Sequence, residues 1–335
     1  MWLFFFAIYG MYHSSVGVEI IILRKEITMN DSRSNISLKV FIAALIYFVL
    51  TPAAFADDFA LGQVVSPGGP SLNGQIHEIN LTTLDTRLIT TIPGTVTGNQ
   101  PNAHAWDDVN KRFYYADALG GQMFVWTQTN GGTPDDDHFS LGLVCAEGYT
   151  GVCNSAVPGG IPAIASAAFY NDRYYFIVEN TDDLWEVEFT ATGVAPFIEI
   201  ATAGVNKIGD ITGNDHVWGF GDIAFDASGL LFGIAKRWDN NQIEFFSYDV
   251  AGAGSYVTIR SEAATPPTYA LAQLTFNTAG VLYACFAGTG ECFTVALANG
   301  IFTSIGTASV GFRDLGGPGP GPTAANRKAW REVID

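Results

Sequence analysis

Charged side chains are scarce in this sequence, and basic ones are the scarcest. Asp, Glu, Lys and Arg make up 15% of the 335 residues, with 16 basic residues against 33 acidic ones. Residues 1–56 hold four basic and three acidic residues, so the rest of the chain carries 12 and 30, a net charge near −18. Such a surface repels phosphate backbones and anionic lipids, which excludes nucleic acid as a partner.

Helical periodicity is also absent from every long stretch after residue 56. The chain instead combines 37 glycines with 13% aromatic residues, which is typical of short strands joined by tight turns. With 48% hydrophobic residues it has ample material for a core. These features predict an all-β fold.

The familiar catalytic signatures are missing too. There is no Gly-x-Ser-x-Gly elbow and no histidine-pair zinc motif, and no cysteine pair has the CxxC spacing of a zinc site. His104 and Asp222 remain as weak catalytic candidates on predicted inner strands. A lone histidine of this kind is more often a hydrogen-bonded structural residue, so the sequence favours a protein that is not an enzyme.

The N-terminus has the pattern of a secretory signal peptide over residues 29–56. Arg33 and Lys39 precede an apolar run of eleven residues at 40–50, and Ala54-Phe55-Ala56 supplies a cleavage site before Asp57. Residues 1–28 then represent either an over-extended start or a membrane anchor. The remaining chain contains no further apolar anchor segment, so we expect an exported protein, periplasmic or extracellular, with no stable membrane anchor in its mature form.

Four cysteines lie in the predicted exported part. Export to an oxidising compartment favours disulfides, and local pairing would join Cys145 to Cys153 and Cys285 to Cys292. Four cysteines allow three connectivities, and the local one is our prediction.

A repeat is the most informative feature. Four segments share a small or apolar start, an aromatic anchor, a polar turn with Asp, Asn or Gly, and a second aromatic seven residues after the first. Each is followed by two more alternating strands, so a four-stranded antiparallel unit recurs every 51–63 residues, as in a propeller blade. The segments begin at Ala103, Ser166, Gly221 and Ala272, with anchors Trp106, Phe169, Phe225 and Phe276.

The two ends of the repeat region complement each other. Residues 59–65, 75–81 and 86–92 resemble strands two to four of a blade without its first strand, and residues 309–315 resemble a spare first strand. Their pairing would close the ring and protect its open edges. We therefore predict a five-bladed β-propeller over residues 57–315, with six or seven blades left open if divergent units are merged. Residues 316–335 form a Gly/Pro linker and a charged tail.

The phrase GDIAFDASGLLFGIA, starting at Gly221, is similar to the repeats of secreted bacterial β-propellers of the YVTN and WD40-like groups, many of unknown function. The resemblance covers roughly residues 59–315 and implies the propeller fold but no catalytic residue. The Trp-Asp ending and Gly-His start of true WD40 repeats are absent.

Propellers bind ligands at the mouth of the central channel, which the first strand of each blade lines. Three residues before each anchor stand Ala103, Ser166, Asp222 and Gln273, polar in three blades. We therefore expect Ser166, Asp222 and Gln273 to face the channel, where they bind either a ligand or only backbone groups and water. Trp218, in a loop just before an inner strand, is the aromatic residue we expect to be exposed and able to stack on a sugar ring.

Two acidic loops are candidates for Ca²⁺, the one cofactor the sequence leaves open. One contains Asp135, Asp136 and Asp137, and the other offers oxygens at alternating positions from Asp210 to Asn214. Neither is an EF-hand. The second loop begins like one, but Asp215 stands in place of the glycine and Gly221 in place of the bidentate glutamate.

The sequence thus favours an exported, non-catalytic propeller that binds a protein, glycan or small ligand at the channel mouth. Two alternatives stay open. One is a hydrolase or lyase that uses Asp and His residues at the mouth, and the other is a structural component of the cell envelope or matrix.

Overall fold

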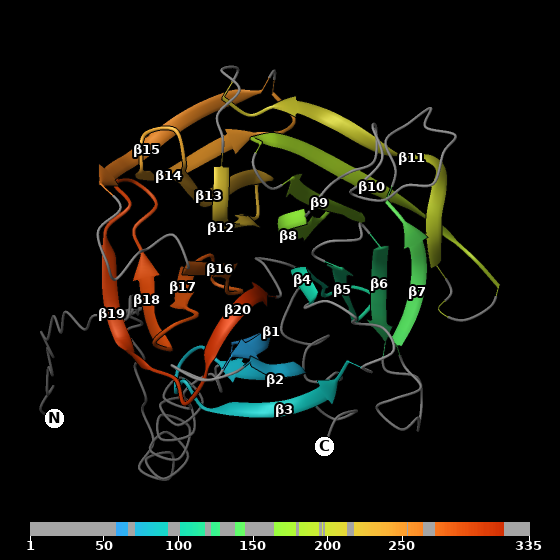
Figure 1. Cartoon of the computed structure of the whole chain (residues 1–335), viewed down its shortest axis with the longest axis horizontal. Coiled ribbons are helices and arrows are strands. Elements are labelled where there is room, and N and C mark those ends of the chain that lie inside the picture. The colour runs from blue at the N-terminus through green and yellow to red at the C-terminus, as the bar shows by residue number, and fades with distance from the viewer. Residues whose placement is uncertain are drawn as a thin grey trace, which may run out of the picture. The chain divides into compact units, whose positions relative to one another are not determined.

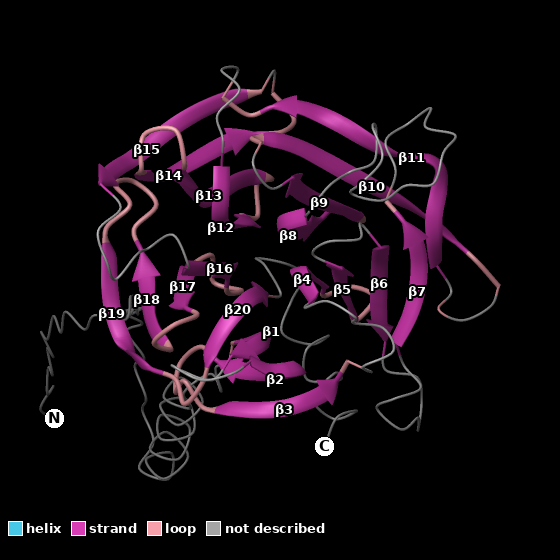
Figure 2. Ribbon diagram, viewed as in Figure 1, coloured by secondary structure: helices cyan, strands magenta, loops and turns pink. Residues whose placement is uncertain are grey.

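The structure of the chain is a computed structural model, and it contains five antiparallel sheets of four strands each. The sheets stand around a common centre as the blades of a propeller (Figure 1). None of the described residues is helical (Figure 2), so that part of the chain contains no helix that could cross a membrane. The described residues are 58–65, 71–92, 101–117, 122–127, 138–144, 164–178, 181–193, 196, 198–212, 218–252, 254–263 and 272–317.

Blades 2 to 5 follow one another along the chain, each running from an inner strand to an outer strand. Blade 2 holds β4 (Pro101–Asp107), β5 (Arg112–Asp117), β6 (Gln122–Thr127) and β7 (His138–Leu143). Blade 3 holds β8 (Ile164–Tyr170), β9 (Arg173–Val178), β10 (Asp183–Ala191) and β11 (Ile198–Asp210). Blade 4 holds β12 (Trp218–Phe225), β13 (Leu230–Arg237), β14 (Gln242–Asp249) and β15 (Ser255–Ala263). Blade 5 holds β16 (Ala272–Phe276), β17 (Leu282–Phe286), β18 (Glu291–Val295) and β19 (Phe302–Thr307).

Blade 1 is built from both ends of the propeller, as the sequence predicts. Its inner strand is β20 (Gly311–Gly316), followed outward by β1 (Phe59–Val65), β2 (Ser71–Asn80) and β3 (Thr86–Thr91). β20 and β1 are antiparallel, with Leu61 opposite Gly316 and Val65 opposite Gly311. This pairing closes the ring, so that each sheet has its inner edge at the central channel and its outer edge at the outside of the propeller.

The core consists of five separate apolar clusters, one between each pair of neighbouring blades. For example, one cluster joins Tyr114 and Val125 of blade 2 to Tyr174 and Phe176 of blade 3. The last cluster joins Val64 and Phe312 of blade 1 to the disulfide of blade 5. Because each blade buries both faces against its neighbours, the ring is stable only when every blade is in place.

The predicted Asp and Asn turns join the inner strand to the second strand in three blades. The side chains of Asp107, Asp226 and Asn277 each accept two backbone N–H groups of the turn that follows, at 2.8–3.0 Å. Blade 3 instead has a two-residue turn, in which Asn171 and Asp172 take left-handed φ values of 49° and 61°.

Because the turns differ in length, the aromatic residues seven positions apart are not paired in the same way in every blade. The seven-residue spacing of aromatics makes a directly opposed pair only in blade 2, where Trp106 faces Phe113. In blade 3 the partner of Phe176 is Ala167, because the shorter turn shifts the register. The outer strand of blade 3 begins at Ile198 and continues to Asp210, through an irregular register opposite β10.

The predicted local disulfide between Cys285 and Cys292 is confirmed, with a sulfur–sulfur distance of 2.10 Å. It links β17 to β18, where the two cysteines are directly opposite each other. Cys145 and Cys153 lie outside the described residues, so their pairing stays a prediction. Residues 1–57 and the tail from 318 onward also lie outside them.

Removing β20 tests the closure. A chain ending at Ala308 lacks the inner strand of blade 1 and uncovers the cluster between blades 5 and 1. We expect it to lose the cooperative thermal transition seen by near-ultraviolet circular dichroism. A control chain ending at Pro318 keeps β20 and should unfold like the full chain. An equally cooperative transition in both truncated chains would contradict the closure.

Candidate functional site

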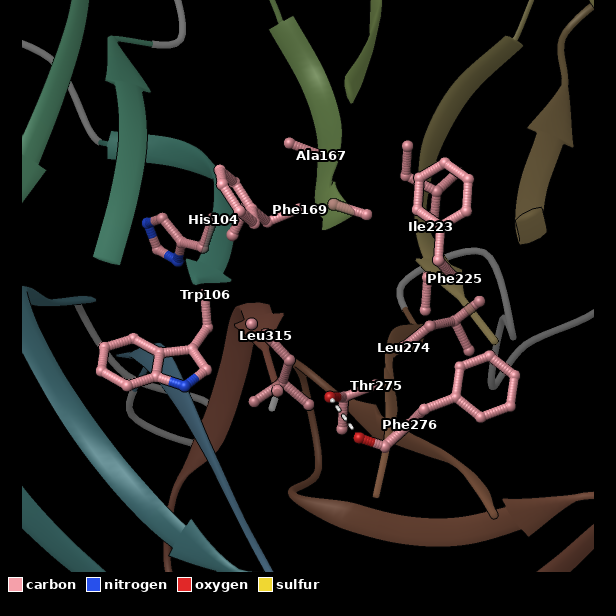
Figure 3. A pocket seen from close by; sticks show the side chains of 15 residues that line it. His104, Trp106, Ala167, Phe169, Ile223, Phe225, Leu274, Thr275, Phe276 and Leu315 are labelled. Carbon is pink, nitrogen blue, oxygen red and sulfur yellow. Dashed lines mark hydrogen bonds between the residues drawn. The ribbon is translucent and has the colours of Figure 1, made fainter. Parts of the chain in front are cut away.

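The inner strands β20, β4, β8, β12 and β16 surround a central channel. Three consecutive residues from each strand line a cavity of about 30 Å³, which has room for only one or two water molecules. The lining is mostly apolar (Figure 3). It consists of His104, Ala105, Trp106, Ala167, Ala168, Phe169, Ile223, Ala224, Phe225, Leu274, Thr275, Phe276, Leu315, Gly316 and Gly317.

This lining confirms how the repeats align, because the four aromatic anchors occupy equivalent places around the channel. It also shows that the fifth inner strand lacks an anchor: Gly317 stands where the other blades have Trp or Phe. A channel this narrow and apolar offers little to a polar ligand at this level.

The residue directly before the three lining residues of each inner strand belongs to a buried ring of mostly polar side chains. Ser166, Asp222 and Gln273 belong to it, and each is at most 5% exposed. Their binding of a ligand stays a prediction. Ala103 completes blade 2, and Asp314 of β20 supplies the fifth member. Sequence reasoning missed Asp314 because β20 has no aromatic anchor from which the position could be counted.

Asp222 and Asp314 make the same pair of hydrogen bonds in different blades. Asp222 Oδ1 accepts the N–H of Ile223 on its own strand at 2.8 Å, and Oδ2 accepts the N–H of Leu274 on the next inner strand at 2.7 Å. Asp314 Oδ1 accepts the N–H of Leu315 at 2.9 Å, and Oδ2 accepts the N–H of His104 at 2.7 Å.

Each carboxyl group therefore joins the inner strands of two neighbouring blades, blade 4 to blade 5 and blade 1 to blade 2. The N–H groups it satisfies are buried donors that would otherwise cost about 1–3 kcal/mol each. In blade 2 the left-handed φ of 55° at Ala103 belongs to a bulge between Asn102 and Ala105, directly before the N–H of His104. We call Asp222 and Asp314 the carboxyl clamps.

Burial governs the titration of both clamps. It raises the pKa of Asp314 to about 8, although the N–H groups of His104, Leu315 and Ala103 act in the opposite direction. Burial, followed by the charge of Asp314, raises the pKa of Asp222 well above its ordinary value. The hydroxyl of the buried Tyr174 donates a hydrogen bond to the carbonyl oxygen of Ala103 at 2.6 Å. Burial is the main cause that raises the pKa of Tyr174, and the charges of Asp314 and Asp222 raise it further.

The His104 side chain lies between blades 1 and 2. Its ring is fully buried, packs 5.1 Å from the ring of Phe113, and accepts the N–H of Gln63 on Nδ1 at 3.4 Å. In Figure 3 the ring is turned away from Ile223 and Leu274 across the cavity. Burial lowers its pKa to about 3, so it stays neutral in the interface rather than acting at the channel surface.

Trp218 is not exposed, contrary to our expectation. β12 begins at this residue, and its indole is 2% exposed and stacks on Phe246 at 4.6 Å between ring centroids. Inclusion of Trp218 in the strand places it in the apolar cluster between blades 3 and 4.

The exposed tryptophan is instead Trp238, in the turn between β13 and β14. Its side chain is 43% exposed, and the ammonium of Lys236 lies 4.3 Å from its ring centroid. The ring packs on the backbone of Gly219 in β12, where a Cβ would lie only 2.0 Å from the indole Nε1. Trp238 therefore sits over the start of an inner strand, on the face opposite to the Asp and Asn turns. Trp238 is flanked in the sequence by polar turn residues, so no strand pattern singled it out.

The acidic loops give no metal site among the described residues. Asp210 Oδ1 and Asp182 Oδ2 both accept the N–H of Thr212, at 3.1 and 3.3 Å, and the Thr212 hydroxyl also donates to Asp182. Burial, with Asp210 nearby, raises the pKa of Asp182 to about 6. No three His, Cys, Asp or Glu side chains of the described part come together to hold a metal. Asn214 and Asp135–Asp137 lie outside it, so Ca²⁺ binding stays a prediction.

No protein-family model matches the chain, and no curated protein matches it in sequence. Solved structures with a similar arrangement include a chain of the nidogen/laminin complex, at 10% identity and a TM-score of 0.47, covering 79% of this chain and 99% of that one. The Pseudomonas aeruginosa periplasmic gluconolactonase is 13% identical with a TM-score of 0.37, covering 77% and 69%. A Staphylococcus aureus virginiamycin B lyase is 11% identical with a TM-score of 0.37, covering 75% and 71%. Likeness at this level carries no activity over to the chain.

The pKa of Asp314 leads to a prediction for stability. An unfolded aspartate has a pKa near 3.9, so between about pH 4 and pH 8 the folded state keeps a proton that the unfolded state has lost. This contribution to the free energy of unfolding is complete below about pH 4 and is lost as pH rises through about 8. Asp314→Asn removes it. The stability of the wild type relative to this variant should therefore fall between about pH 5 and pH 8 in urea unfolding.

Asp226→Asn is the matched control, since an amide oxygen can still accept the turn N–H groups that Asp226 accepts now. We expect its stability to follow that of the wild type across this range. If the wild type instead gained stability over Asp314→Asn with rising pH, the buried carboxyl would be held as an anion.

Proposed function

We propose that this protein is an exported, non-catalytic propeller that binds a glycan on the face where the inner strands begin, with Trp238 as the stacking platform. The predicted signal peptide and the Cys285–Cys292 disulfide support export, because disulfides persist in oxidising compartments. A protein or a small molecule as the ligand would be a different outcome of the test below.

The observation that carries the proposal is the exposure of Trp238. An exposed indole offers a flat apolar surface on which the C–H face of a sugar ring can pack once the Lys236 ammonium, 4.3 Å from the ring centroid, moves aside. The residues that follow it, Asp239, Asn240 and Asn241, are exposed as well. The Asn241 amide can exchange hydrogen bonds with sugar hydroxyls beside the ring. The Asp239 carboxylate already accepts two hydrogen bonds from Arg237, and the Asn240 amide is bonded to Gln242. Flat apolar packing with polar groups at its margin is the general pattern of a ligand site.

The state of the carboxyl clamps supports a function without catalysis. A general acid or base must reach the proton that it transfers. The carboxyl oxygens of Asp222 and Asp314 accept hydrogen bonds from backbone N–H groups of their own strand and of the neighbouring blade. The His104 ring lies buried against Phe113. The alternative, a hydrolase or lyase using His104 and Asp222, would require both groups to leave these contacts. No observation on the described residues favours a structural envelope role over ligand binding.

Replacement of Trp238 tests the proposal. The purified protein is applied to an array of neutral and acidic oligosaccharides, and the glycan retained is then titrated by calorimetry. We expect Trp238→Ala to weaken binding at least about tenfold, since a stacked aromatic contact contributes on the order of 1–2 kcal/mol. Trp238→Phe, which keeps an aromatic face, should stay within about threefold of the wild type.

Leu88→Ala is the matched control, because Leu88 is 51% exposed on β3 of blade 1, away from Trp238. Its affinity should equal that of the wild type. Absence of any retained glycan, or unchanged affinity in Trp238→Ala, would reject the proposal.

A further inference from the structure

Blade 5 differs from the rest of the propeller in charge. Its 37 residues from Ala272 to Ala308 contain a single charged side chain, Glu291, in a chain whose net charge is −17. Blade 4, from Trp218 to Ala263, has nine: Asp222, Asp226, Lys236, Arg237, Asp239, Glu244, Asp249, Arg260 and Glu262. Blade 5 therefore has very few charged side chains. Its net charge of −1 is matched by blade 1, where Glu78, Asp85 and Asp314 are offset by Arg87 and Arg313.

Blade 5 also exposes apolar side chains. Among the described residues seven large hydrophobic side chains are exposed, and three of them, Val281, Ile301 and Ile305, belong to blade 5. Ile301 and Ile305 are 50% and 39% exposed, at the start and the middle of the outer strand region. Val281 lies in the turn between β16 and β17, so the exposed apolar residues at the outer edge of the blade are Ile301 and Ile305.

The outer strand of blade 5 is also an edge without charged side chains. β19 lies on the outside of the ring (Figure 1), and only β18 pairs with it. Proteins guard such free edges with charged residues. Three of the other outer strands carry charged residues: Arg87 in β3, Glu199 and Lys207 in β11, and Arg260 and Glu262 in β15. In β7 the only ionisable side chain is His138, and burial lowers its pKa to about 4. The sequence of β19, FTSIGT, has no ionisable side chain and no proline.

We infer that blade 5 is a self-association surface, on which β19 pairs antiparallel with β19 of a second copy around a two-fold axis. An antiparallel pair of identical strands is the closed, two-fold arrangement that an exposed edge allows. It would place Ile305 of each copy beside the other copy's strand and continue the sheet of blade 5 from one propeller into the next.

The distribution of charge favours a second copy of this chain as the partner that pairs with β19. A basic partner would be attracted to the acidic blades rather than to blade 5. Two copies of this chain repel each other over most of their surfaces, and blade 5 is the sector where they can meet with almost no like charges opposed. The inference is independent of glycan binding, since Trp238 belongs to blade 4 and to the turn between β13 and β14.

The salt dependence of association is a specific consequence. The remaining repulsion between two acidic copies is screened by salt, whereas strand pairing and apolar contact are not weakened by it. Dimer formation should therefore strengthen with ionic strength, the opposite of an interface held by ion pairs. A contact built around one six-residue strand from each copy belongs to the class of small, reversible interfaces.

Sedimentation equilibrium of the purified protein tests the inference at about 50 mM and about 500 mM NaCl. We expect a monomer–dimer equilibrium whose dissociation constant falls at least about threefold at the higher salt. Ile305→Lys places a charge on the edge and should raise the constant at least about tenfold. Leu88→Lys, the same change at an exposed apolar residue of β3, should leave it within about twofold of the wild type. Circular dichroism confirms that both variants are folded.

A second measurement locates the contact. With the two-fold axis near the middle of β19, Ser304→Cys should form a disulfide between two copies under mild oxidation, because opposed residues of antiparallel strands are within disulfide reach. Ser255→Cys, at the start of β15, should not. A wild type that stays monomeric at both salt concentrations, equal effects of the two lysine variants, or a dimer without the Ser304→Cys cross-link would overturn the inference.

Discussion

The propeller depends on hydrogen bonds that join the inner strands of neighbouring blades across the central channel. Sheets in this fold contact each other through side chains, and blades 2 and 3 are joined by hydrogen bonds from Tyr174 to the Ala103 carbonyl and from Asn102 to the Ile164 carbonyl. The carboxyl clamps Asp222 and Asp314 provide that connection from blade 4 to blade 5 and from blade 1 to blade 2. Since each clamp satisfies two buried N–H groups, it fixes the position of one strand relative to the next.

Closure of the ring and the clamps act at the same place. β20 carries Asp314 and also pairs with β1, so a single short strand from the C-terminal end completes blade 1 and binds it to blade 2. The consequence for function is that polar groups near the axis serve the fold. Residues available to a ligand or a partner, such as Trp238 and Ile305, lie instead on turns and outer strands, where substitution leaves the clamps intact.

The sequence contained enough to predict five blades, the closing strand and the Cys285–Cys292 disulfide, because each depends on local spacing that repeats along the chain. Asp222, Ser166 and Gln273 were placed in the ring for the same reason. Asp314 was missed since Gly317 replaces the aromatic anchor on β20. Trp218 was expected in a loop, but β12 extends back to include it, and strand membership decides whether an indole packs or faces water. Exposure depends on neighbouring blades, which no local pattern encodes.

Hydrogen exchange of single amides tests the central claim most directly. If the carboxyl clamps hold the blades together, the N–H groups of Leu274 and His104 exchange only through global unfolding and are among the slowest in the protein. Faster exchange at these two amides than at the amides of the surrounding inner strands would show that the clamps open on their own, and the account of the ring would be wrong.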